Sequence, residues 1–148
     1  MAAQDLSRRG VVAGLVLVVT APALATTLPP DAEAEQKRLI GDAIPQDGGV
    51  ILRLPETAEN GAQVPVTVGV EAAQTVERHV TAIHLIATRN PTPGIATLRF
   101  TPASGRAQAT TRIRLAEGQT VVALAVWNDG TVRRATATVQ VAVGGCIT

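Results

Sequence analysis

From about Gly49 onward, apolar and polar residues alternate along the chain. The clearest stretches are 64–70, 107–115 and 135–143, in which every second residue is apolar or Thr. This period of two is typical of half-buried strands. Turn dipeptides separate the stretches: Asn60-Gly61, Asn90-Pro91, Ser104-Gly105, Glu117-Gly118 and Asp129-Gly130. The pattern predicts about seven strands in an all-β, immunoglobulin-like β-sandwich.

A short helix is predicted before the strands, over 31–40. Asp31 is a residue type that can cap a helix start, and Gly41 is suited to end one. Lys37 and Arg38 fall at the negative end of the helix dipole. We expect this helix to pack on the outside of the sandwich.

The stretch 120–127 departs from the alternation because it is apolar on both faces, and 79–87 is partly so. The outer face of a strand in an isolated sandwich is usually polar, so something should cover this face. Val122, Leu124 and Val126 share one face and are the predicted contacts of a partner protein. Cover by the N-terminal helix or a loop is the alternative, which we rank slightly lower.

The first 25 residues have the three parts of an export signal. Arg8 and Arg9 form the charged start, 11–19 is an apolar run, and 23–25 offers a small-residue cleavage site. The apolar run is shorter than the roughly 20 residues that a membrane helix needs. The arginine pair after Ser7 favours a twin-arginine (Tat) signal over an ordinary secretory one. We therefore expect cleavage near Ala25 and a periplasmic protein without a membrane anchor.

Composition supports one folded domain over 26–143. Hydrophobic residues make up 46% of the 148 residues, enough for a core. The net charge is +1, and removing Arg8, Arg9 and Asp5 with the signal leaves it at zero. A neutral protein has no electrostatic reason to bind nucleic acid.

Few residues can carry out chemistry. His79 and His84 are the only histidines, their odd spacing puts them on opposite faces of a strand, and there is one cysteine. No metal site or cofactor is therefore expected. Ser104 lies in a turn without a nucleophile motif, so we expect a protein that is not an enzyme.

Cys146 is the residue most suited to chemistry, although a lone cysteine near a terminus is often incidental. It follows Gly144 and Gly145, whose backbone freedom predicts a flexible tail over 144–148. Such a tail suits a carrier that inserts a reactive atom into pockets of other proteins. Arg112 and Arg114, on the outer face of one predicted strand, are either solvated or bind oxyanions or a partner.

These features resemble the SoxY family of sulfur-oxidation proteins over roughly 31–146. The motifs that carry the resemblance are Asn90-Pro91, 105–107, 111–116, 119–123, Asp129-Gly130 and 143–146. The resemblance implies a sulfur carrier that holds thiosulfate-derived sulfur covalently on Cys146. It also implies pairing with a second β-sandwich subunit, SoxZ. The partner enzymes it implies are a c-type cytochrome, a dimanganese hydrolase and a sulfane dehydrogenase.

One departure concerns the end of the chain. The family tail usually has Gly-Gly on both sides of the cysteine, whereas Ile147-Thr148 follows Cys146 here. Two alternatives therefore stay open. One is a SoxY-like paralogue that pairs without carrying sulfur, and the other is a structural β-sandwich without covalent chemistry.

Overall fold

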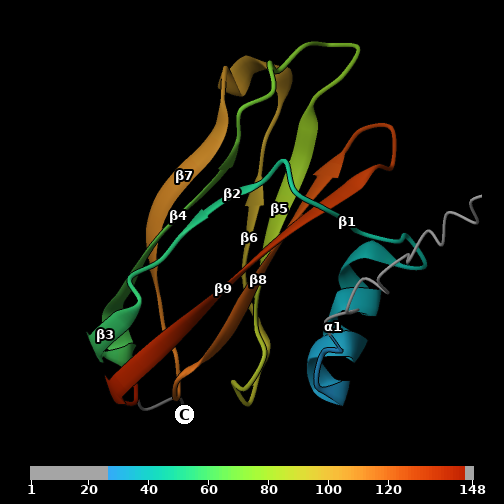
Figure 1. Ribbon diagram of the computed structural model, residues 1–148. Helices are drawn as coiled ribbons and strands as arrows, with labels where there is room; N and C mark the ends of the chain where they lie inside the picture. The colour runs from blue at the N-terminus through green and yellow to red at the C-terminus, as the bar shows by residue number, and fades with distance from the viewer. Residues whose placement is uncertain (1–26, 146–148) are drawn as a thin grey trace, which may run out of the picture.

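Two β-sheets face each other, and one helix, α1 (Pro30–Ile40), packs on the outside of the larger sheet (Figure 1). The computed structural model describes residues 27–145. No helix in this part of the chain is long and apolar enough to cross a membrane. After α1 the elements are β1 (Gln46–Asp47), β2 (Ile51–Arg53), β3 (Thr57–Asn60), η1 (Gly61–Gln63), β4 (Val64–Val70), β5 (Val80–Ala87), β6 (Gly94–Arg99), η2 (Pro102–Ser104), β7 (Ala107–Ile113), β8 (Gln119–Trp127) and β9 (Val132–Val143).

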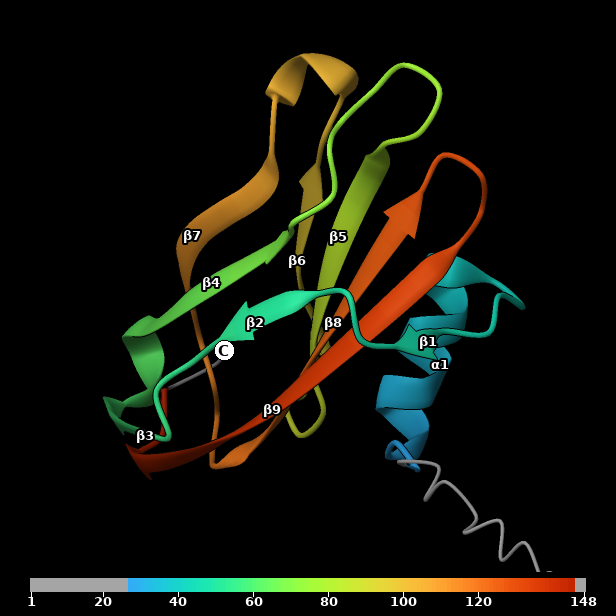
Figure 2. The same cartoon turned by 45° about the horizontal axis from the view of Figure 1, so that its top comes forward.

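The larger sheet has the order β1-β9-β8-β5-β6, with β3 also paired to β9, and the smaller sheet has the order β2-β4-β7 (Figure 2). This arrangement confirms the predicted immunoglobulin-like sandwich. The strands beyond the predicted seven are β1 and β3, which both run parallel to β9. They are two and four residues long, too short for a period of two to be visible in the sequence.

The core between the sheets consists mainly of aliphatic side chains. Val64, Val66 and Val68 of β4 are at most 1% exposed and face residues such as Ile83 and Leu85 of β5. Burial of each such side chain stabilises the fold by about 1.5–3 kcal/mol. The alternating valines therefore fix which face of β4 points inward, because a shift by one residue would expose them all.

The helix begins one residue earlier than predicted. Pro29 is the N-cap and Pro30 the first helical residue, and no side chain caps the helix start. The expected cap by Asp31 is therefore wrong, because proline already suits the first turn, where its missing N–H has no helical partner. The predicted end at Gly41 is confirmed: its φ is 64°, and its amide donates to the Lys37 carbonyl oxygen.

A second apolar cluster lies between α1 and the larger sheet. Ala32 of α1 is fully buried there, together with Val122 and Leu124 of β8, which are 0% exposed, and Val126 is partly buried beside them. The prediction that Val122 and Leu124 contact a partner protein is therefore wrong, whereas the predicted contact of the partly buried Val126 stays a prediction. The helix is the cover, since its apolar side already buries the outer face of β8.

Candidate functional site

The two ends of the chain, residues 1–26 and 146–148, lie outside the described residues. The export signal, the carrier role of Cys146 and the effect of the Ile147-Thr148 ending therefore stay predictions from the sequence. The structure does describe Gly144 and Gly145, the two residues before the cysteine. The candidate site is built from the contacts that hold this pair.

Three glycines meet where β9 ends. A Cβ atom on Gly145 would lie 2.8 Å from the Ala62 amide nitrogen and 2.9 Å from the Gly61 carbonyl carbon. A Cβ on Gly144 would overlap the Ala116 carbonyl oxygen, and one on Gly61 would overlap the Leu115 carbonyl oxygen. The atoms in the way belong to the backbone and cannot move aside as a flexible side chain can. Only residues without a side chain fit at this contact.

Backbone hydrogen bonds join the same segments. The Gly145 amide donates to the Leu115 carbonyl oxygen at 3.0 Å, and the Leu115 amide donates to the Gly61 carbonyl oxygen at 2.8 Å. Gly145 is buried. The structure therefore gives Gly144 and Gly145 a packing role, which differs from the tail flexibility expected from the sequence.

Strand β3 brings η1 to this place. It runs parallel to β9, with Asn60 opposite Val143, so the start of η1 lies beside the end of β9. The Asn60 side-chain oxygen accepts a hydrogen bond from the Ala62 amide at 2.8 Å and caps η1. The dipeptide Asn60-Gly61 thus forms the start of a 3₁₀ turn that supports the segment before Cys146.

The side chain of Asn90, which is 6% exposed, holds the loop between β7 and β8 by hydrogen bonds. Its side-chain NH₂ donates to the Arg114 carbonyl oxygen at 2.9 Å. Its side-chain oxygen accepts from the Ala116 amide at 3.0 Å and from the Gln119 side-chain NH₂ at 2.8 Å. Asn90 therefore holds the loop that supplies the Leu115 carbonyl oxygen to Gly145.

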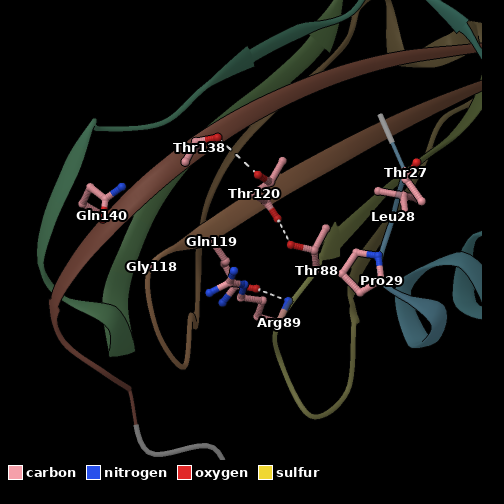
Figure 3. Close-up of a pocket in the computed structure, with 10 residues that line it drawn as sticks. All are labelled: Thr27, Leu28, Pro29, Thr88, Arg89, Gly118, Gln119, Thr120, Thr138 and Gln140. Atoms are coloured by element: carbon pink, nitrogen blue, oxygen red, sulfur yellow. Dashed lines mark hydrogen bonds between the residues drawn. The ribbon is translucent and has the colours of Figure 1, made fainter. Parts of the chain in front are cut away.

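A polar cleft of about 380 Å³ opens beside the same loop (Figure 3). Threonines of the neighbouring strands β8 and β9, and Thr88 directly after β5, line it. The Thr88 hydroxyl donates to the Thr120 carbonyl oxygen at 3.0 Å, and the hydroxyls of Thr120 and Thr138 are 3.2 Å apart. The other lining residues are Thr27, Leu28, Pro29, Arg89, Gly118, Gln119 and Gln140. This end of the sandwich thus contains both the backbone contact that holds Gly144 and Gly145, here called the tail attachment, and a cleft lined by hydroxyl groups.

The histidines lie apart from this end. His84 is buried in β5, and its Nδ1 is 2.9 Å from the Thr97 hydroxyl of β6. Burial lowers the pKa of His84, as do the positive charges of Arg99 and Arg38. Within residues 27–145, no group of three or more His, Cys, Asp or Glu side chains is placed to hold a metal ion.

Comparison with models of protein families identifies the family of this chain. The model of the family described as "Sulfur oxidation protein SoxY" matches residues 36–146. The chain belongs to the SoxY family. A search of curated protein sequences gives no match.

Solved structures agree with the SoxY assignment. The SoxY sulfur carrier protein from Chlorobium limicola f thiosulfatophilum is 26% identical, with a TM-score of 0.63, over 75% of this chain and 96% of that chain. A superoxide reductase (neelaredoxin) variant from Ignicoccus hospitalis is 17% identical, with a TM-score of 0.57, over 74% and 86% of the two chains. A proposed superoxide reductase from Thermotoga maritima is 18% identical, with a TM-score of 0.54, over 66% and 87%. The likeness to the two reductases shows the sandwich fold alone.

Sequence reasoning missed the supporting role of Asn90. Its only local signal is the Asn-Pro pair, which is typical of a turn. Its hydrogen bonds reach 24 and 26 residues along the chain, so no local pattern could reveal them. The glycine contact was missed for the same reason, because Gly61 is remote from Gly144 in sequence.

Proposed function

We propose that this chain is a covalent sulfur carrier and that Cys146 is its attachment site. The observation that carries the proposal is the SoxY family match, which extends to residue 146, the only cysteine of the chain. The likeness to the Chlorobium sulfur carrier protein supports it. The carrier itself catalyses no reaction; partner enzymes act on the sulfur that it holds.

Loading is a two-electron oxidation. The Cys146 thiolate and thiosulfate (S₂O₃²⁻) form a sulfur–sulfur bond, giving Cys–S–S–SO₃⁻ and two electrons, which a c-type cytochrome partner accepts. The thiolate is the reacting form of cysteine. Water then cleaves the bond to the terminal sulfone, which leaves as sulfate with two protons, and Cys–S–S⁻ remains. A dimanganese hydrolase performs this second step, and a sulfane dehydrogenase oxidises the remaining sulfane sulfur.

The carrier pairs with a second β-sandwich subunit of the SoxZ type. Because α1 buries Val122 and Leu124, this contact uses a different surface from the outer face of β8. Analytical ultracentrifugation of the two proteins mixed should show a heterodimer. A clean monomer in the presence of the SoxZ-like subunit would contradict the pairing.

The place of action is the periplasm, reached through a Tat signal in residues 1–25. The supporting feature is the Ser7-Arg8-Arg9 sequence before a short apolar run. Replacing both arginines with lysine should leave the precursor in the cytoplasm. Unchanged export of that variant would indicate an ordinary secretory signal.

The Ile147-Thr148 ending makes the carrier selective for its own enzymes. A branched side chain next to the sulfur clashes in a pocket shaped for glycine, whereas an apolar pocket gains about 1.5–3 kcal/mol by burying it. Replacing Ile147-Thr148 with Gly-Gly should reduce turnover with this chain's own enzymes. Equal turnover of both tails with these enzymes and with enzymes of a Gly-Gly system would contradict the selectivity.

Mass spectrometry of the intact protein tests the carrier function. Protein from thiosulfate-oxidising cells should carry adducts of sulfur or sulfonate mass on the C-terminal peptide. A Cys146→Ser variant should carry none and should fail to support thiosulfate oxidation. If wild-type Cys146 stays unmodified under these conditions, the chain is a non-carrying paralogue or a structural sandwich instead.

A further inference from the structure

The outer face of the small sheet has no cover in the described part of the chain. Helix α1 lies on the opposite side of the molecule, over the large sheet (Figure 1). The outward positions follow from the register. Arg53 lies opposite Thr67, and Thr67 lies opposite Thr110, whose hydroxyl is 2.9 Å from that of Thr67. These three residues therefore form one row across the outer face.

Small side chains keep this face flat. Pro65, Thr67 and Gly69 are its β4 positions, next to Arg112, Thr110 and Gln108 of β7. A Cβ on Gly69 would lie 2.8 Å from the Gln108 side chain, so Gln108 lies across the glycine and not away from the sheet. The flat middle of this sheet face suits contact with a broad protein surface better than binding of a small molecule.

The charge on this face is mainly positive. The strands β2, β4 and β7 contain no Asp or Glu. Four exposed arginines lie along the face or at its ends: Arg53, Arg106, Arg112 and Arg114. Glu71, at the end away from Gly145, is the one acidic residue among those lining the three hollows of this face.

These four arginines differ from most others in the chain. Of the ten arginines within residues 27–145, four form ion pairs, with Glu35, Asp129, Glu117 and Asp47. None of the four ion-paired arginines lies on the small sheet. Of the six without an ion pair in this part of the chain, four are the arginines of the small-sheet face. Arg112 makes a hydrogen bond to the Gln63 side chain, which leaves its charge uncompensated.

The arginines along β7 extend towards the contact between Gly145 and Leu115. From Arg106 to Arg114, β7 and the residue on either side of it span about 27 Å when extended. The residue after Arg114 is Leu115, whose carbonyl oxygen holds the Gly145 amide at 3.0 Å. A protein that docks on this face therefore also reaches the end of the sandwich from which Cys146 continues.

We propose that the outer face of β2-β4-β7 docks an acidic surface of the enzyme that loads sulfur on Cys146. The proposal rests on the carrier function and names the chemistry of its partner. Four arginines that form no ion pair within residues 27–145 are complementary to carboxylates on the partner. Attraction between such surfaces raises association rates about 10- to 1,000-fold and weakens as salt screens it.

The test is the rate at which the purified thiosulfate-coupling cytochrome from the same source loads the carrier. Arg112→Glu/Arg114→Glu should lower kcat/KM at least about tenfold at about 0.05 M ionic strength. The loss should shrink towards zero near 0.5 M salt, and kcat at saturating carrier should be unchanged. The control is Lys37→Glu/Arg99→Glu, which makes the same charge change on α1 and the large sheet and should stay within about twofold of wild type. Circular dichroism checks that both variants are folded.

A binding measurement separates this proposal from the carrier function. A Cys146→Ser carrier cannot hold sulfur but should still bind the cytochrome, and Arg112→Glu/Arg114→Glu added to it should abolish that binding. Wild-type protein that binds through this face but never takes up sulfur would overturn the carrier function alone. Equal kinetics and binding of the two double variants would overturn the docking face alone. Binding of this face to anionic phospholipid vesicles, without any effect on the cytochrome, would also overturn it.

Discussion

The amide of Gly145 donates a hydrogen bond to the Leu115 carbonyl oxygen at 3.0 Å, one residue before the cysteine proposed to carry sulfur. This bond joins the end of β9 to the loop between β7 and β8. Cys146 is the next residue along the chain. A fixed Gly145 therefore sets the point from which the carrier residue extends.

Gly145→Ala should loosen this attachment. The added Cβ would lie 2.8 Å from the Ala62 nitrogen, so either the backbone shifts or the hydrogen bond to Leu115 is lost. Overpacking of this kind costs about 1–3 kcal/mol. We expect a lower free energy of unfolding in urea and faster hydrogen exchange of the Gly145 position.

Gly118→Ala is the matched control at the same end of the sandwich. Its Cβ would approach the Gln140 side-chain oxygen at 3.2 Å, and that side chain can turn away. It should therefore cost clearly less than Gly145→Ala. Equal stability of wild type and Gly145→Ala would show that the glycine contact is not tight in solution.

Asn90→Ala should destabilise the loop that holds Gly145. It leaves the Arg114 carbonyl and the Ala116 amide without their Asn90 partner, whereas the Gln119 side-chain NH₂ keeps its hydrogen bond to the Glu117 carbonyl oxygen. Each buried polar group left unpaired costs about 1–3 kcal/mol. We expect a lower midpoint in chemical unfolding and slower sulfur loading, because the tail attachment is no longer fixed.

Asn128→Ala provides the comparison for Asn90→Ala. Asn128 also bonds backbone groups, the His79 amide and the Glu77 carbonyl oxygen, but these bonds are exposed to water. It should cost less stability and leave sulfur loading unchanged. A result in which both variants lose loading equally would rule out a specific role of Asn90.

The strands and the helix could be predicted because their signals are local. The period of two in 64–70 and 135–143 reports one buried face, and Gly41 ends α1 as expected. The cover of β8 could not be predicted in the same way. A strand that is apolar on both faces shows that its outer face is buried, but α1 and a partner protein would leave the same pattern in 120–127.

The candidate site was predictable only in part for a similar reason. Cys146 could be proposed from its position and from the family resemblance. For Gly144 and Gly145 the sequence alone predicts flexibility, because glycine has that property wherever it occurs. Their packing role depends on Gly61 and Ala116, which come close only when β3 pairs with β9.

Leu124→Ala should destabilise the fold by about 2–5 kcal/mol, the usual cost of truncating a fully buried leucine. The loss should appear as a lower melting temperature of the carrier alone, without any partner. Val143→Ala is the control, since Val143 is 65% exposed and should change stability by less than about 0.5 kcal/mol. Suppose that Leu124→Ala without a partner had the melting temperature of wild type but failed to bind another subunit. A partner protein, and not α1, would then cover Leu124.

His84 should make the fold less stable in mild acid. It is 8% exposed beneath α1, where Glu35 and Arg38 face it from the helix and Arg99 from β6. Burial and the two arginines lower the pKa of His84 from its ordinary value of 6.5, although Glu35 raises it in part. The unfolded chain therefore takes up a proton at a higher pH than the folded protein does.

It follows that stability is unaffected by His84 above about pH 7 and falls as the pH drops through 6.5, by at most about 1.4 kcal/mol per pH unit. The carboxyls with lowered pKa values, Glu35, Asp47 and Asp129, act in a separate window below about pH 4.5, where their stabilisation is lost as the pH falls. Urea unfolding between pH 5 and 8 should show a free energy of unfolding that falls towards low pH. His84→Gln should make this dependence on pH weaker. Arg38→Gln, which removes a positive charge, should raise the His84 pKa in an NMR titration. A His84 that titrates at or above 6.5 in the wild-type protein would show that it is not buried beneath the helix.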